Sequence, residues 1–198
     1  MRTYILVATA ATIALAAAAI PMLRADDAPA QTEQIAQAEP SAWEVVPAPT
    51  DGPPFPAASV VSDDGYRLYL WSRTDERGRQ VFAELHAPGD VTLAGTMPVW
   101  QIDDQPAIDA DEIRLAGESQ GLLWGFATER VAIWMIWLGQ GDIPESDPAH
   151  DWFHGERLDV TVELAAGEKR IVEFPLTGAR AAIEEAVEIR PQQAAAGS

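Results

Sequence analysis

The pentapeptide GESQG at residues 117–121 has the G-x-S-x-G pattern of a nucleophile elbow. In that motif a strand enters a strained turn that opens into a helix, which lifts the serine hydroxyl above the sheet. Acid and base candidates for a triad follow later in the chain: Asp142, Asp147, His150 and His154. Residues 122–126 (LLWGF), however, favour a strand. We therefore expect a polar turn, and a serine hydrolase that uses Ser119 is the less favoured hypothesis.

A second candidate for chemistry is the pair His150 and His154, four residues apart. On a helix this spacing places both imidazoles on one face, where they could hold zinc or copper. Pro148 precedes the pair and Gly155 follows it, which limits any helix to about one turn. Spacing fixes no third ligand. We expect a surface turn and predict no cofactor; His150 and His154 are the candidates if a metal binds.

Acidic residues crowd one short stretch: Asp103, Asp104, Asp109, Asp111 and Glu112. Calcium requires several oxygen ligands, and an EF-type loop places them at alternate positions around a glycine. The spacing here does not match that loop. We expect a solvated acidic loop, with a calcium site as the alternative and with Asp103 and Asp104 as candidate ligand contacts.

Seven tryptophans are many for 198 residues. Exposed tryptophans on a sheet can form a platform for a carbohydrate or a peptide, whereas buried ones fill a core. Trp71, Trp124 and Trp134 lie in apolar runs, so we assign them to the core. Trp100 and Trp152 stand beside polar residues and are the candidates for a binding platform.

The composition excludes some function classes. The chain has 31 acidic and 13 basic side chains, a formal net charge of −18, and no cysteine. Such an acidic protein is repelled by nucleic-acid phosphates, so we predict no nucleic-acid binding. Without cysteine there is no disulfide, no thiolate nucleophile and no cysteine-ligated zinc.

The first 30 residues have the order of a secretory signal peptide. Arg2 precedes an uncharged apolar run over residues 5–20, and small residues that permit cleavage near residue 25 or 30 follow. As a helix the apolar run would rise only about 24 Å, less than the roughly 30 Å of a hydrocarbon core. We therefore expect a cleaved signal and a periplasmic or secreted protein of a Gram-negative bacterium, with a retained N-terminal membrane anchor as the alternative.

The remainder divides by composition. Residues 31–58 are rich in proline and alanine and indicate a flexible linker, in which residues 43–46 are a candidate short strand. Residues 59–190 indicate a single domain, and residues 191–198 a disordered tail.

Within the domain, short apolar runs alternate with turn residues. We expect strands at 66–73, 80–86, 91–94, 99–103, 112–116, 121–128, 131–139, 158–164 and 170–174. The run at residues 131–138 is apolar on both faces, which is typical of a central strand covered on both sides. A helical stripe ends the domain: Ala179, Ala182, Ile183, Ala186 and Val187. The fold class is mainly β: an antiparallel β-sandwich, with jelly-roll or immunoglobulin-like packing, and one C-terminal α-helix.

Three segments carry a family resemblance: residues 97–104 (MPVWQIDD), 155–162 (GERLDVTV) and 172–183 (VEFPLTGARAAI). On them the chain resembles the invasion-associated locus B-like family of Gram-negative periplasmic proteins, over about residues 80–188. The resemblance implies an export signal, a β-sandwich and a non-enzymatic role in the envelope or in host interaction. It implies no catalytic residues.

Three functions follow from the sequence. The first is a non-catalytic protein that binds another protein or an envelope component, whose identity is unknown. The second is a small-ligand or metal-binding module that uses Trp100, Trp152, Asp103 and Asp104. The third is the hydrolase that uses Ser119.

Overall fold

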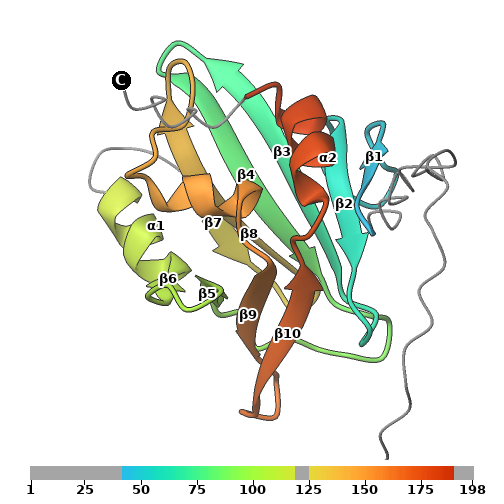
Figure 1. Cartoon of the computed structure of the whole chain (residues 1–198). Coiled ribbons are helices and arrows are strands. Elements are labelled where there is room, and N and C mark those ends of the chain that lie inside the picture. The colour runs from blue at the N-terminus through green and yellow to red at the C-terminus, as the bar shows by residue number, and fades with distance from the viewer. Residues whose placement is uncertain (1–41, 119–124, 190–198) are drawn as a thin grey trace, which may run out of the picture. The chain divides into compact units, whose positions relative to one another are not determined.

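The computed structural model describes residues 42–118 and 125–189, and these form two antiparallel sheets with short helices beside them (Figure 1). The larger sheet has the order β1-β2-β3-β4-β8-β7. Its strands are β1 (Glu44–Val46), β2 (Ala57–Val61), β3 (Arg67–Asp75), β4 (Gly78–His86), β7 (Gly125–Ala127) and β8 (Val131–Gly139). The smaller sheet has the order β10-β9-β5-β6. Its strands are β5 (Val99–Ile102), β6 (Ile108–Asp109), β9 (Arg157–Glu163) and β10 (Lys169–Pro175).

Three helical segments complete the described chain: α1 (Ala110–Glu118), the 3-10 helix η1 (Pro148–Phe153) and α2 (Ala179–Val187). The prediction of a mainly β, two-sheet antiparallel sandwich with a C-terminal helix is confirmed. None of the helices in this part of the chain has the length and apolar character needed to span a membrane.

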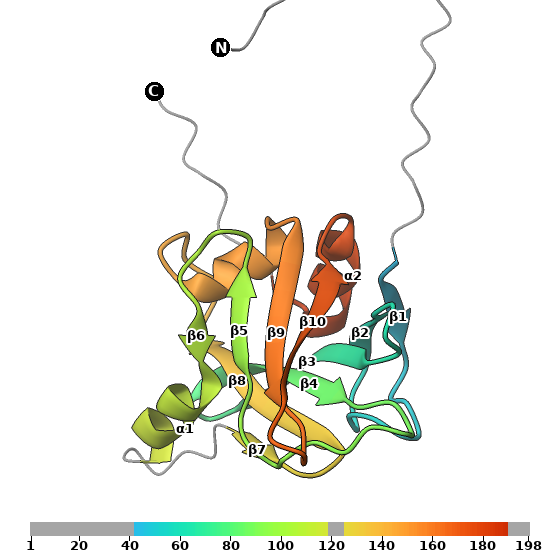
Figure 2. The same cartoon turned by 90° about the horizontal axis from the view of Figure 1, so that it is seen from below.

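The main core lies between the two sheets, whose strands run in different directions (Figure 2). Alternating side chains of each strand enter it, as Leu68 and Leu70 do from β3 and Leu158 and Val160 from β9. This alternation follows from the two-residue side-chain period of a strand. The central strand β8 contributes Trp134 to this core.

The opposite face of the larger sheet carries a second apolar cluster: Ala57, Tyr69, Trp71, Phe82 and Met135. Met135 of β8 is 1% exposed and lies in this cluster, so β8 is covered on both sides, as its sequence predicts. The loop between β1 and β2 contacts this face, since a Cβ built on Gly52 would lie 3.1 Å from the Tyr69 ring.

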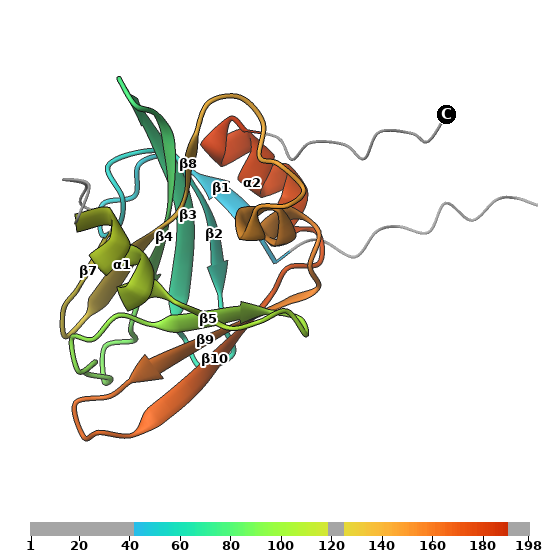
Figure 3. The same cartoon turned by 90° about the vertical axis from the view of Figure 1, so that its left-hand side faces the viewer.

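Helix α2 lies against the inner face of the larger sheet beside the smaller sheet (Figure 3). Its predicted apolar stripe is entirely buried: Ala179, Ala182, Ile183, Ala186 and Val187. The carbonyl of Val187 accepts hydrogen bonds from Arg79 Nη1 at 2.6 Å and from Ser72 Oγ at 3.0 Å. Strands β3 and β4 therefore supply donors for the C-terminal end of the helix, which lacks partners of its own.

The strand expected at residues 112–116 is wrong, because this segment lies in helix α1. The Asp109 carboxylate accepts the Asp111 N–H at 2.8 Å, which is the arrangement of an N-cap. Arg114 pairs with Asp111 and with Glu118, three and four residues away. Of the crowded acids that we expected to form a solvated loop, Asp109, Asp111 and Glu112 thus start a helix, while Asp103 and Asp104 lie in the turn after β5.

The linker expected at residues 31–58 is shorter than the composition suggests. Strand β1 and part of β2 lie within that range, so the domain begins earlier than residue 59. Trp43 is buried, and its indole Nε1 donates a 2.6 Å hydrogen bond to the carbonyl oxygen of Pro175. The packing of Trp43 against the domain therefore fixes a proline-rich segment for which local propensity alone predicts a flexible, extended chain.

Several expectations fall partly or wholly beyond the described residues. The signal peptide at 1–30, the tail at 191–198 and the first half of the strand expected at 121–128 lie there. Of the strand expected at 91–94, only Leu93 forms a β-bridge, with Leu164.

The hydrogen bonds at the end of α2 predict the effect of a substitution. Arg79→Met removes the donor to the last carbonyls of α2 and keeps the aliphatic stem. We expect the free energy of unfolding to fall by about 1–3 kcal/mol in urea denaturation. Arg77→Met is the matched control, because the Arg77 side chain is exposed on the β3–β4 turn. Equal stability of the two variants would contradict this assignment.

Candidate functional site

A cavity of about 440 Å³ opens between the β5–β6 segment and the chain that leads into η1. Figure 2 shows that these segments meet at one end of the smaller sheet. One wall is apolar, with Trp100, Ile102 and Ile108; the other carries Glu145, Asp147 and Asp151. The volume lies within the range of about 300–1,000 Å³ that small-molecule sites occupy.

The apolar wall follows from the alternation of β5. Trp100 and Ile102 point inward and are 3% and 2% exposed, while Gln101 between them is half-buried. The Trp100 ring packs against the ring of Trp152, with centroids 5.4 Å apart and planes inclined by 57°. Trp152 is fully buried and does not line the cavity. The two residues therefore form no exposed platform, and only Trp100 borders the site.

The acidic wall combines one engaged carboxylate with two that are not engaged. Asp147 caps η1, because its Oδ1 accepts the Ala149 N–H at 2.9 Å and Pro148 occupies the first turn. The carboxylates of Glu145 and Asp151 form no hydrogen bond or ion pair within the described residues. Two carboxylates are thus available to a ligand at the edge of the cavity.

Asp103 has a structural role next to the cavity. Its carboxylate accepts the backbone N–H groups of Glu156, at 3.1 Å, and of Arg157, at 2.9 Å. Asp103 itself has φ 48°, a left-handed conformation that aspartate tolerates better than most residues. A Cβ built on Gly155 would lie 2.4 Å from Ile102 Cγ2, so glycine permits the close approach of the two segments. Asp103 therefore ties the chain after β5 to the start of β9.

Asp104 is exposed and has no such contacts in the described chain. Neither Asp103 nor Asp104 lines the cavity. Of the four ligand contacts expected from the sequence, the structure places Trp100 at the site, Trp152 behind it, and the two aspartates outside it.

His150 and His154 lie on and just after η1 with their rings stacked, 4.4 Å between centroids and 23° between planes. Within the described ranges, no group of three or more histidine, cysteine, aspartate or glutamate side chains is placed to hold a metal ion. The pKa of His154 is lowered, first because partial burial disfavours the imidazolium and then because His150 and Arg180 are nearby. The pair thus forms a packed contact between η1 and α2.

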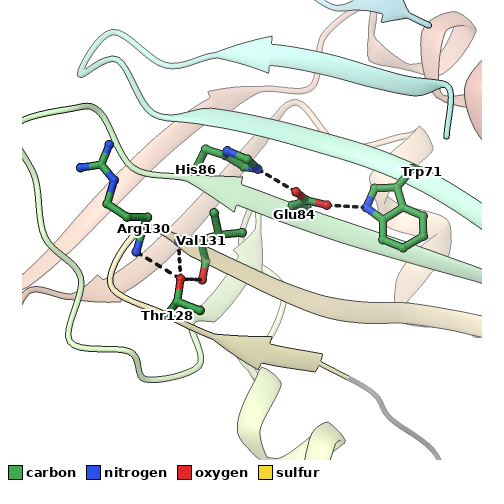
Figure 4. Close-up of polar contacts among 6 residues, drawn as sticks. All are labelled: Trp71, Glu84, His86, Thr128, Arg130 and Val131. Carbon is green, nitrogen blue, oxygen red and sulfur yellow. Dashed lines mark hydrogen bonds and ion pairs between the residues drawn. The ribbon is translucent and has the colours of Figure 1, made fainter. Parts of the chain in front are cut away.

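A buried carboxylate on the outer face of the larger sheet is a further candidate (Figure 4). Glu84 is 5% exposed; its Oε2 accepts the Trp71 Nε1–H at 3.0 Å, and its Oε1 lies 2.7 Å from His86 Nε2. The Tyr69 ring packs edge-on against His86 at 5.2 Å. Both carboxylate oxygens of Glu84 have partners within the sheet, so we assign the cluster to stabilising the sheet surface.

The sequence reasoning missed Glu145, Asp151 and Ile108. The Asp147–Pro148 pair is a helix-start signal that could have placed η1 and hence Asp151. Nothing local indicates that this segment lies against β5 and β6, because tertiary packing brings them together. Ser119 lies outside the described residues, so its predicted turn is not placed. No protein-family model, curated protein or solved structure matches the chain.

The hydrogen bonds of Asp103 predict a difference between two substitutions. Asp103→Ala leaves two backbone N–H groups without acceptors and puts alanine at a positive φ, so we expect a loss of about 1–3 kcal/mol in the free energy of unfolding. Asp103→Asn keeps an acceptor oxygen and tolerates the backbone, and should lose clearly less. Asp104→Ala is the neighbouring control and should be neutral in urea denaturation. Equal losses for Asp103→Ala and Asp104→Ala would show that the Asp103 hydrogen bonds to the start of β9 do not stabilise the domain.

The lowered pKa of His154 predicts a pH dependence of stability. Between the folded pKa and the ordinary value of about 6.5, the unfolded chain binds more protons, so acidification favours unfolding. This contribution is complete above about pH 6.5 and is lost as the pH falls through the folded pKa. We expect the urea midpoint of the wild type to fall more between neutral pH and about pH 5 than that of His154→Asn. Parallel profiles would show that His154 titrates alike in both states.

Proposed function

We propose that the chain is an exported, non-catalytic ligand-binding protein of the cell envelope, and that the cavity beside Trp100 is its binding site. The observation that carries this proposal is the cavity itself: about 440 Å³, with an apolar wall opposite two unengaged carboxylates. A concave site with apolar walls and a few convergent polar groups is the usual form of a small-molecule site.

The roles of the other polar candidates favour binding over catalysis. Asp147, one of the acids for a Ser119 triad, caps η1. His150, one of the bases, stacks on His154. These side chains have structural partners, whereas Glu145 and Asp151 line a cavity and their carboxylates form no hydrogen bond or ion pair with the part of the chain that the structure describes.

The export and family assignments are part of the same proposal. The signal-peptide pattern of residues 1–30 supports export to the periplasm or the medium. The three segments that resemble the invasion-associated locus B-like family contain β5, most of β9, and the adjoining parts of β10 and α2. Strands β5, β9 and β10 are consecutive in the smaller sheet, so the resembling segments form one structural unit next to the cavity.

A blocking variant tests the site. Ser146 is exposed and lines the cavity, so Ser146→Trp places a large ring in it, whereas Thr50→Trp adds the same ring to an exposed loop on the other sheet. In a thermal-shift screen of amines, sugars and short peptides, we expect compounds that raise the Tm of the wild type and of Thr50→Trp but not of Ser146→Trp. Saturation at about 100 times Kd corresponds to roughly 2.7 kcal/mol of stabilisation, which gives a shift of several degrees.

Isothermal titration of each active compound against the three proteins confirms the location. If no compound stabilises the wild type, or if Ser146→Trp responds as the wild type does, the proposed binding site is refuted.

A further inference from the structure

We infer that the cavity selects a small organic cation, a protonated amine or guanidinium attached to an apolar group. The inference rests on the proposed function and names the chemistry of its ligand. Among residues 42–118 and 125–189, every charged side chain that lines the cavity is acidic, namely Glu145, Asp147 and Asp151, and no arginine or lysine of these ranges lines it.

The positive group of the ligand belongs with Glu145 and Asp151. Asp147 has one oxygen engaged by the Ala149 N–H, so it contributes charge and at most one free oxygen. Glu145 is exposed and Asp151 is half-buried, and neither carboxylate has a hydrogen-bond donor among the described residues, so both can accept one from a ligand. A charged N–H donor forms shorter and stronger hydrogen bonds with a carboxylate than a neutral donor does.

The apolar group of the ligand belongs with the opposite wall. Trp100, Ile102 and Ile108 line this wall; Trp100 and Ile102 are almost fully buried, so the half-buried Ile108 offers most of the area that these three expose to a ligand. Contact with this wall removes apolar area of the ligand from water, which contributes about 25 cal/mol per Å². A cation without an apolar part would use only one wall, and a neutral apolar compound only the other.

The field of the whole protein acts in the same direction. With a formal net charge of −18, the protein attracts cations and repels anions over a distance set by the ionic strength. An anionic ligand would have to overcome both this field and the local carboxylates. Charge and shape therefore agree on one ligand class.

Three compounds with the same ring and similar length test the inference: tryptamine, which is cationic, indole-3-ethanol, which is neutral, and indole-3-acetate, which is anionic. We expect isothermal titration at low salt to rank their affinities in that order, with tryptamine at least about tenfold tighter than indole-3-acetate, or roughly 1.4 kcal/mol. Added salt should weaken tryptamine and leave indole-3-ethanol nearly unchanged.

Isosteric variants locate the charge. Glu145→Gln and Asp151→Asn should each weaken tryptamine by roughly three- to tenfold, without affecting indole-3-ethanol. Glu129→Gln is the matched control, because Glu129 is exposed on the β7–β8 turn and does not line the cavity. The Tm of each variant without ligand shows whether the fold is kept.

The outcomes separate the two proposals. If the three compounds bind equally and Ser146→Trp abolishes binding, the cation selectivity is refuted and the proposed binding site stands. If all three bind Ser146→Trp as they bind the wild type, both proposals are refuted. If tryptamine does not bind at millimolar concentration, the cation inference is refuted, and the wider thermal-shift screen decides the proposed function.

Discussion

The two sheets differ in width, and this mismatch is the constraint on which the rest of the domain depends. Six strands face four, so the smaller sheet leaves part of the inner face of the larger one without a cover. Helix α2 supplies the cover with five buried apolar residues, and Arg79 and Ser72 hold its C-terminal end. The same helix packs against η1, and the chain leading into η1 forms the acidic wall of the cavity. The cavity thus lies beside η1, which packs on the helix that completes the core.

Sequence reasoning succeeded where one physical signal dominated. The sequence predicts strands β3, β4, β8, β9 and β10 and helix α2 within two residues at each boundary. Strands β9 and β10 alternate between buried and more exposed residues, β3, β4 and β8 are short apolar runs between turn residues, and α2 carries a helical apolar stripe. Strand β2 was missed because prolines precede it, and its buried alanines carry little hydrophobic signal. The apolar residues of α1 favour a strand, whereas the Asp109 cap and the charge pairs of Arg114 favour a helix, and the structure has the helix. Polar interactions between residues close in sequence therefore determine the secondary structure of this segment.

The candidate site shows how local polarity can mislead. Its polar neighbours make Trp100 a candidate for an exposed platform, with burial in the core as the alternative. In a strand with one buried face, however, the residues on either side of a buried residue point outward and are polar. Gln101 points the other way from the Trp100 ring, and Asp103 has turned to bind backbone N–H groups of the next strand in the sheet. Trp100 nevertheless borders the cavity, since β6 and the chain before η1 leave space beside it. Contacts between segments far apart in the sequence bring the other lining residues to that space, and a local sequence pattern does not predict such contacts.

In so acidic a protein, a carboxylate without a hydrogen-bond partner does not by itself indicate a ligand site. Acidic side chains outnumber basic ones by 31 to 13, so many carboxylates lack a basic partner of their own. A carboxylate that is solvated at an open surface has water as its better partner, and a cation bound there is screened. Glu145 and Asp151 differ because they share a cavity with Trp100, Ile102 and Ile108. The apolar wall displaces water from a ligand held there, and a reduced dielectric strengthens the attraction of the same carboxylates. Selectivity for a cation therefore depends on the concavity as much as on the charges.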